Sequence, residues 1–295
     1  MKEVVQYVID GISLGALDAL LALGVGLIFG VMRLVNFAQG AYIMLAGYVL
    51  FFTISASWAV VIPLTLLAGI AIAIITERVA FRPLRGADGS TLMVASFSVA
   101  FLIQSIMITI EGSGPKSIPI WSFVSESIKV IGLQIPVLDL ISIGVSACLI
   151  VGLWLFLTRT RTGLAMRAAA EDFQMLRLLG GRATRVIAVA FALSGLLAAI
   201  AGVLLFSQTA VVGPEVGTDA VLIGFVATVI GGLGSVQGAA LGGFLLGALT
   251  TALQATLPNG LSAYRDAFVF GAVIALLVFR PQGLLGNRAD AERVV

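Results

Sequence analysis

The sequence predicts an all-α polytopic membrane protein with eight or nine transmembrane helices, some of them broken or half-length. Three observations support this fold class. Hydrophobic residues make up 60% of the 295-residue chain and charged residues only 11%, against about 25% charged residues in soluble domains. The apolar runs approach the ~20 residues that cross a bilayer as a helix. They do not alternate as barrel strands would, and the 34 glycines suit close helix packing.

Nine apolar stretches are separated by charged, glycine-rich or proline-containing segments, and we expect a helix in each within a single domain, 1–295. They cover residues 8–31, 41–53, 58–76, 91–110, 137–157, 186–206, 220–231, 236–257 and 267–279. The stretches 41–53 and 220–231 are short for a full crossing, so either can be a half-membrane segment and eight crossings is the alternative to nine.

The connections carry recognisable helix breakers. Residues 32–40 form a break after the first stretch, Pro83 should stop the helix that enters 77–90, and residues 258–260 (Pro-Asn-Gly) form a turn. We expect residues 111–135 to be a polar connector and the tail, 282–295, to be polar and frayed.

Arginine is concentrated in 77–90, in 159–185 and after residue 279, which predicts a cytoplasmic location for these parts. Three predicted helices precede the cytoplasmic loop 77–90, so the N-terminus is expected on the outer side of the membrane. Lys2 is cancelled by Glu3 and the following apolar run is too long for a signal peptide, so it should stay as the first span. We therefore expect a multi-pass membrane protein with its arginine-rich loops and C-terminus in the cytoplasm.

The sequence lacks the residues that several kinds of catalytic and metal-binding site require. The chain has no histidine, which removes histidine metal sites and Ser-His triads, and its one cysteine, Cys148, cannot form an intrachain disulfide. GISLG (11–15) lies within a membrane helix, so we interpret it as a helix-packing face and not as a nucleophile elbow. Neither the glycine-rich stretches nor the net charge of +2 indicates nucleotide or nucleic-acid binding, and no cofactor is expected.

Asp18 lies inside the first stretch, where a carboxylate is costly unless it meets water or a partner. It is a candidate for a translocation path, and the alternative is a charge solvated in an aqueous vestibule. Asn36, Gln39 and Gln237 are neutral polar residues beside helix breaks; they can line a path or simply cap broken helices.

The two breaks resemble each other. FAQGA (37–41) and SVQGA (235–239) share Gln-Gly-Ala, and each opens a helix rich in small residues. Broken segments at corresponding places in two halves are typical of transporters built from repeats. Five residues do not establish a duplication, so an internal repeat is one interpretation and chance similarity the other.

The segment 159–185 is the longest polar part of the chain and holds six of its 17 lysines and arginines: Arg159, Arg161, Arg167, Arg177, Arg182 and Arg185. Ala165, Ala169, Phe173 and Leu176 share one helical face, opposite Arg167, Glu171 and Gln174. We predict one amphipathic helix over 164–179, ended by Gly180-Gly181. Its alanine-rich face favours a groove on a partner protein over a lipid surface.

Four segments resemble the permease subunits of ABC importers for branched-chain amino acids, specifically the H-type subunit of the Liv type. They are LGVGLIFGVMRLVNFAQG (23–40), ERVAFRPLR (77–85), RTGLAMRAAAEDFQMLRLLG (161–180) and VIGGLGSVQGAALGG (229–243). Their order covers nearly the whole chain. The motifs specify the permease superfamily better than the solute, because urea and short-chain amide permeases resemble them too.

The resemblance implies a pore-forming subunit of a bacterial cytoplasmic (inner) membrane, without its own ATP site. Its partners would be a second homologous permease, two cytoplasmic ABC ATPases and an external or periplasmic solute-binding protein. Residues 161–180 would be the cytoplasmic coupling helix, with these coupling residues: Gly163, Arg167, Ala170, Glu171, Asp172 and Gly180. The translocation path would involve Asp18, Asn36, Gln39, Gly40, Gly234, Gln237 and Gly238.

Two positions depart from the family pattern. The family usually has histidine in N-F-A-H-G, where this chain has Gln39, so imidazole chemistry is dispensable there. Family members commonly carry a neutral or aromatic residue near Asp18. Besides the importer, the sequence leaves open a stand-alone secondary transporter, for which Asp18 would be the ion-coupling group; a membrane enzyme lacks a convergent catalytic set.

Overall fold

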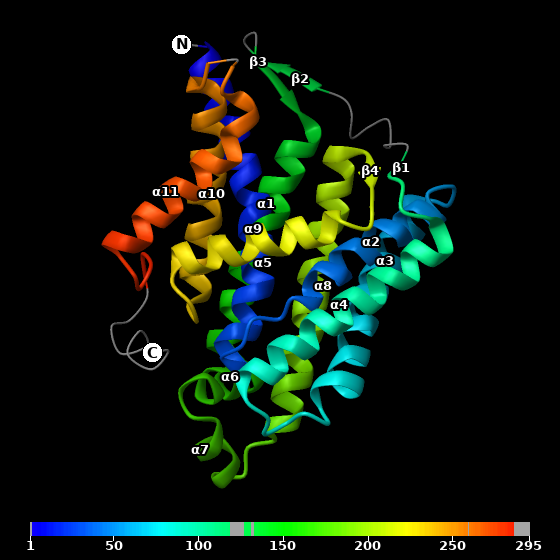
Figure 1. Ribbon diagram of the computed structural model, residues 1–295, viewed down its shortest axis with the longest axis vertical. Coiled ribbons are helices and arrows are strands. Elements are labelled where there is room, and N and C mark those ends of the chain that lie inside the picture. Colours follow the sequence, from blue (N-terminus) through cyan, green and yellow to red (C-terminus); the bar gives the residue numbers. More distant parts are fainter. Residues whose placement is uncertain (1, 119–126, 131–132, 259, 286–295) are drawn as a thin grey trace.

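The computed structural model describes residues 2–118, 127–130, 133–258 and 260–285, and these are mainly helical (Figure 1). The helices are α1 (Lys2–Met32), α2 (Ala38–Thr53), α3 (Trp58–Thr76), the π-helix η1 (Glu77–Phe81), α4 (Gly89–Glu111), α5 (Val137–Arg159), α6 (Arg161–Glu171), α7 (Phe173–Leu178), α8 (Ala183–Thr209), α9 (Val216–Gly231), α10 (Val236–Thr256), the 3-10 helix η2 (Ser262–Tyr264) and α11 (Arg265–Phe279).

Every apolar stretch predicted to be a helix is a helix. Within the described residues, seven helices are long and apolar enough to cross a membrane. The two short stretches form α2 and α9, with 16 residues each. The chain is therefore a polytopic, all-helical membrane protein.

Helix α1 forms the centre of the bundle. It packs against α10 most extensively and also against α9, α8 and α5, and most of its residues from 13 to 31 are buried. Helix α9 runs across α1 rather than along it (Figure 1). By contrast, α4 and α11 are mostly exposed along their apolar length, which is the surface composition that lipid requires.

Glycines allow the central helices to approach closely. A Cβ at Gly243 or Gly247 of α10 would collide with the backbone of α1 at Ala19 or Gly15. Gly69 of α3 and Gly195 of α8 also lie in close contact, because a Cβ on either would collide with the carbonyl oxygen of the other. Small residues at helix interfaces are how membrane bundles gain packing contacts without a hydrophobic driving force.

The connector that we expected only to be polar contains strands. β1 (Lys116–Ser117) pairs antiparallel with β4 (Val211–Val212), and β2 (Ser127–Val130) forms an antiparallel pair with β3 (Leu133–Pro136). The prediction for this connector was thus incomplete. Alternating side chains give little signal in strands of four residues or fewer.

The arginine-rich segments 77–90 and 159–185 lie together at one end of the molecule, opposite β2 and β3 (Figure 1). Arg85 Nη1 donates to Thr184 Oγ1 across 2.8 Å, and Arg85 also pairs with the buried Glu77. The helix ends at Phe81, two residues before Pro83, as predicted.

The start of the tail is not frayed. The main-chain N–H groups of Leu284 and Leu285 donate to Ile230 and Gly231 at the end of α9, at 2.8 and 3.0 Å. The prediction for 282–295 was wrong for residues 282–285, because the last carbonyls of α9 need partners. Residues 286–295 lie outside the described part of the chain.

Candidate functional site

The segment predicted as one helix is two helices. Asp172 has an extended backbone (φ −148°, ψ 105°) between α6 and α7. Its carboxylate Oδ1 accepts from Met175 N at 2.8 Å, so Asp172 is the N-cap of α7. The predicted continuous helix over 164–179 was wrong because helical periodicity continues across a cap whose competing hydrogen bond breaks the helix.

The start of α6 is fixed by a second cap and by a glycine. Thr160 Oγ1 accepts from Gly163 N at 3.0 Å. A Cβ at Gly163 would collide with the backbone of Phe156 and Leu157 at the end of α5. Gly163 therefore sets the tight angle between α5 and α6.

The buried face of α6 contains Met166 and Ala169, which are 1% and 4% exposed. Ala165 is half-buried, as is Leu176 in α7. The predicted alanine-rich face thus packs against this chain's own helices, α1, α5 and α8. Met166 was not anticipated, although its spacing of three from Ala169 places it on the same face.

The polar residues of the segment face outward. Arg167, Glu171 and Asp172 are exposed, and no ion pair joins Arg167 to Glu171 in this part of the described chain. Gly180 has φ 78° and ends α7, and Gly181 N donates to Leu176 O at 2.9 Å. The predicted glycine stop is confirmed.

Arg33 connects this segment to the break after α1. Its side chain donates from Nε and Nη2 to Ala170 O at 3.2 and 2.9 Å. Ala170 lies in the last turn of α6, where carbonyls lack intrahelical partners, so Arg33 caps that helix end. Arg33 itself has φ 56°, a left-handed backbone that is strained for a non-glycine residue.

The second break lies beside the same arginine. Arg33 Nη1 is 3.9 Å from the position that a Cβ on Gly234 would occupy, and a Cβ on Gly30 would lie 3.6 Å from Gly234 O. Gly234 and Gln237 are exposed, whereas Gly238 is buried against Gly231. The two breaks with Gln-Gly-Ala thus meet at the end of α1, but their glutamines differ: Gln39 is buried.

Asn36 lies two residues before α2 and Gln39 lies in its first turn, and they are 0% and 1% exposed. Asn36 Oδ1 accepts from Ala38 N at 3.2 Å, so Asn36 has a capping role. Ser194 Oγ of α8 lies 3.2 Å from both Gln39 Oε1 and Gly24 O. Gly24 makes room for Gln39, because a Cβ at residue 24 would collide with the Gln39 amide.

One buried amide group at the start of α2, Gln39 Nε2, has no hydrogen-bond partner within the described chain. Buried donors without partners cost about 1–3 kcal/mol each and occur mainly where water, an ion or a ligand can reach them. The start of α2 therefore keeps an unsatisfied polar group inside the helix bundle.

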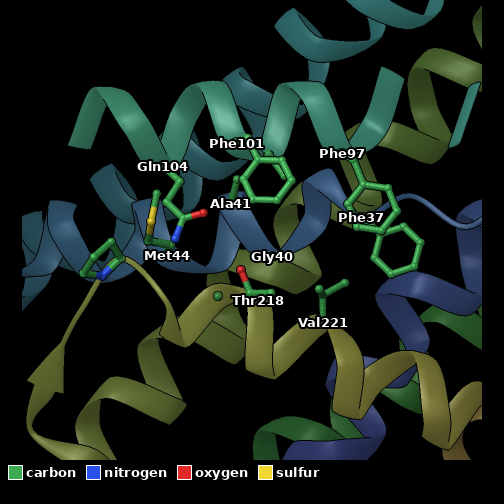
Figure 2. A pocket seen from close by; sticks show the side chains of 12 residues that line it. Phe37, Gly40, Ala41, Met44, Phe97, Phe101, Gln104, Thr218 and Val221 are labelled. Carbon is green, nitrogen blue, oxygen red and sulfur yellow. The ribbon is translucent and has the colours of Figure 1, made fainter. Parts of the chain in front are cut away.

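A cavity lies between α2, α4 and α9 (Figure 2). Phe97, Phe101 and Gln104 point from α4 toward Gly40 and its neighbours on α2 (Figure 2). The lining residues are Phe37, Gly40, Ala41, Met44, Phe97, Ala100, Phe101, Gln104, Pro214, Gly217, Thr218 and Val221. Apart from Gln104 and Thr218, these residues carry apolar side chains or none.

The cavity holds about 40 Å³, whereas ligand sites usually enclose roughly 300–1,000 Å³. Phe37 narrows it by stacking on Phe97, with ring centroids 4.1 Å apart. A cavity of this size does not hold an amino acid in the described conformation. The α4 residues that line the cavity were not predicted, although 97, 101 and 104 follow the spacing of one helical face.

Asp18 stands apart from this cavity. Its backbone packs against Gly243 of α10, its side chain is 5% exposed, and it has no hydrogen bond or ion pair within the described chain. The alternative of a charge solvated in an open vestibule does not fit this burial. Thus, of the residues predicted for a path, Asn36, Gln39 and Gly40 lie together, and Asp18, Gly234 and Gln237 lie elsewhere.

A bundle of membrane-length helices with two shorter helices that begin beside polar or glycine breaks is typical of a membrane transport permease. Comparison with known proteins agrees. The family described as branched-chain amino acid transport system / permease component matches residues 7–278. The chain belongs to this family.

Named relatives span the whole length. The high-affinity branched-chain amino acid transport permease BraD of Pseudomonas aeruginosa is 35% identical over 100% of both chains. LivH of Escherichia coli, with the same description, is 32% identical over 98% of this chain and 97% of its own. The probable permease LivH of Methanocaldococcus jannaschii is 28% identical over 90% and 88%. No solved structure matches significantly.

Proposed function

We propose that this chain is the transmembrane permease subunit of an ATP-driven ABC importer that carries leucine, isoleucine and valine across the cytoplasmic membrane. The observation that carries the proposal is end-to-end similarity to permeases named for high-affinity branched-chain amino acid transport. A second homologous permease, two cytoplasmic ATPases and an external solute-binding protein complete the importer. The arginine-rich end faces the cytoplasm in this arrangement.

Coupling to the ATPases runs through α6 and α7. The exposed residues of this unit that would meet an ATPase groove are Arg167, Glu171 and Asp172, while Gly163 and Gly180 set its two ends. Its buried face already packs on the permease. An ATPase that grips the exposed face therefore moves a unit attached to α1 through Ala170 and Arg33.

The translocation path begins at the start of α2 and continues through the cavity that Gly40 lines. Apolar walls with two neutral polar groups, Gln104 and Thr218, suit an aliphatic side chain better than a charged or strongly polar solute. Movement of α6 pulls on Arg33, three residues before Asn36. This gives ATPase closure a short route to the break that precedes α2.

Competition for uptake tests the cargo. Membrane vesicles that contain the whole importer take up labelled leucine, and excess isoleucine, valine, urea or a short amide is added. Isoleucine and valine should compete, and urea and amides should not. Competition by urea without competition by valine would instead assign the chain to a urea or amide importer.

A double substitution tests the coupling unit. Arg167→Ala with Glu171→Ala removes two exposed side chains that make no ion pair with each other, so the fold should persist. We expect intact membrane insertion and ATP hydrolysis that no longer drives uptake. Wild-type uptake by the double variant would contradict this assignment.

The buried carboxyl of Asp18 favours a second candidate, a stand-alone secondary transporter that couples an ion to solute. Co-purification separates the two candidates. Stoichiometric recovery of an ATPase with the tagged chain supports the importer. Concentrative uptake by the lone chain in liposomes, driven by an ion gradient, supports the secondary transporter.

A further inference from the structure

The arginine-rich end contains a cavity of about 600 Å³ that the transport proposal does not use. It lies between η1, at the end of α3, and the segment from α7 into α8. Its lining residues are Glu77, Arg78, Arg82, Arg177, Gly181, Arg182, Ala183, Thr184, Arg185 and Ala188. This volume falls in the range of ordinary ligand sites.

The lining is strongly basic. Five of its residues are arginines, and in the described chain none of the five forms an ion pair. Glu77 is the single acid among these lining residues, and its carboxylate is already bound by Arg85. Arg85 is in turn held by Thr184. The cavity therefore has a large uncompensated positive charge on a fixed frame.

The beginning of α8 adds to this field. Arg182 is the N-cap of this 27-residue helix and its side chain makes no capping hydrogen bond. The positive end of the helix dipole, at Ala183 and Thr184, lines the cavity, and the guanidinium of Arg182 cannot cap it because it has no acceptor. Helix N-termini combined with arginine side chains are well suited to phosphate groups.

Large apolar side chains border the arginines. Val79 follows Arg78 and is 72% exposed, and Leu178 and Leu179 follow Arg177 and are 81% and 80% exposed. A free inorganic anion gains nothing from contact with apolar side chains. A phospholipid carries a phosphate and acyl chains in the same molecule, so it can contact both the arginines and the apolar residues. Basic pockets at the end of membrane helices bind the headgroups of anionic lipids in this way.

We propose that this basic cavity binds the phosphate of an anionic phospholipid, with Arg78 and Arg82 on one wall and Arg182 and Arg185 on the other. The lipid would connect the end of α3 to the start of α8. A cytoplasmic location alone accounts for arginine in these loops. It does not account for five arginines that surround one cavity next to exposed leucine and valine.

The test is lipid binding by the full purified chain in detergent. Native mass spectrometry measures retention of phosphatidylglycerol and phosphatidylcholine, supplied in equal amounts. The thermal unfolding midpoint is measured with each lipid and with inorganic phosphate. We expect preferential retention of phosphatidylglycerol and a higher midpoint with it than with either phosphatidylcholine or inorganic phosphate.

Arg78→Gln with Arg82→Gln should weaken phosphatidylglycerol binding by at least about tenfold, since each arginine near an anionic surface contributes about fivefold. The matched control is Arg159→Gln with Arg280→Gln, which removes the same charge from arginines that do not line the cavity. The control should bind as the unaltered chain does.

Three results would overturn the proposal. One is equal loss of binding in both double variants, which would indicate attraction by overall charge. Another is equal stabilisation by inorganic phosphate, which would indicate a site for a free anion. The third is undiminished lipid binding by Arg78→Gln/Arg82→Gln together with loss of ATPase recovery, which would make the cavity a protein-docking surface.

Discussion

Arg33 donates two hydrogen bonds to the main-chain oxygen of Ala170, across 137 positions of sequence. This contact joins the end of the central helix, α1, to the end of α6. It also lies beside Gly234 in the break between α9 and α10. Three segments that resemble the same permease family therefore converge on one guanidinium group.

Removal of this group should uncouple transport from ATP hydrolysis. For Arg33→Ala in the assembled importer we expect uptake per ATP hydrolysed to fall by about two- to fivefold, because a cation at an exposed helix C-terminus contributes roughly 0.3–1 kcal/mol. Simultaneous assays of labelled leucine uptake and phosphate release measure this ratio.

Arg33→Gly is the control for the backbone, since glycine relieves the strain at φ 56° but also removes the side chain. It should uncouple as Arg33→Ala does. Normal coupling in Arg33→Gly would show that backbone strain matters and the contact with Ala170 does not.

Gly24 and Gln39 should behave as a pair. Gly24→Ala places a methyl group against the Gln39 amide, and overpacking of this kind costs about 1–3 kcal/mol. Gln39→Ala removes the obstacle, so the double variant should be more stable than Gly24→Ala alone. Thermal unfolding of the purified chain measures both, and an unrescued double variant would argue against this packing.

Gly40 and Gly217 bring α2 and α9 together at the cavity, and a Cβ on either would collide with the carbonyl of the other. Gly40→Ala and Gly217→Ala should each destabilise by about 1–3 kcal/mol. Their combined cost should be less than the sum, because one displacement of the helices relieves both collisions.

Gly144 of α5 is the matched control for these glycines, since an added Cβ there meets nothing within 4 Å. Gly144→Ala should leave the unfolding midpoint unchanged or raise it, because alanine favours the helix. Strict additivity of the Gly40 and Gly217 effects would contradict direct contact between the two positions.

Asp18→Asn should leave leucine uptake by the assembled importer within about twofold. Asparagine has nearly the same shape, and the carboxylate it replaces has no ion pair or hydrogen bond in the described chain. Transport kinetics with wild-type and variant importers check this. A loss of tenfold or more would favour an ion-coupling role for Asp18 and the secondary-transporter alternative.

The helices could be predicted because their cause is local. Lipid offers no hydrogen-bond partners, so each long apolar stretch has to satisfy its own backbone. The breaks at Arg33 and Gly234 were visible for the same reason, as polar and glycine residues interrupt those stretches. The stop at Gly180 also follows from a single residue type, glycine at a left-handed backbone.

The break between α6 and α7 at Asp172 was harder to predict from the sequence. Aspartate is a good N-cap, but the surrounding alanine, phenylalanine and leucine residues keep helical spacing on both sides. The helical periodicity therefore favoured one continuous helix. The hydrogen bond from Met175 N to the Asp172 carboxylate ends one helix and begins another. The alanine-rich face was expected to meet a partner, yet its Ala169 is buried within this chain.

The sequence by itself determined the class of protein, the order of its helices, the breaks between them and the family, because all of these depend on composition and short-range patterns. Only the tertiary structure decided which polar residues meet. It buried Gln39 against Gly24 and left Gln237 exposed, although both occur in the same Gln-Gly-Ala motif. Contacts such as Arg33 with Ala170 depend on how distant helices pack, and no local pattern encodes that geometry.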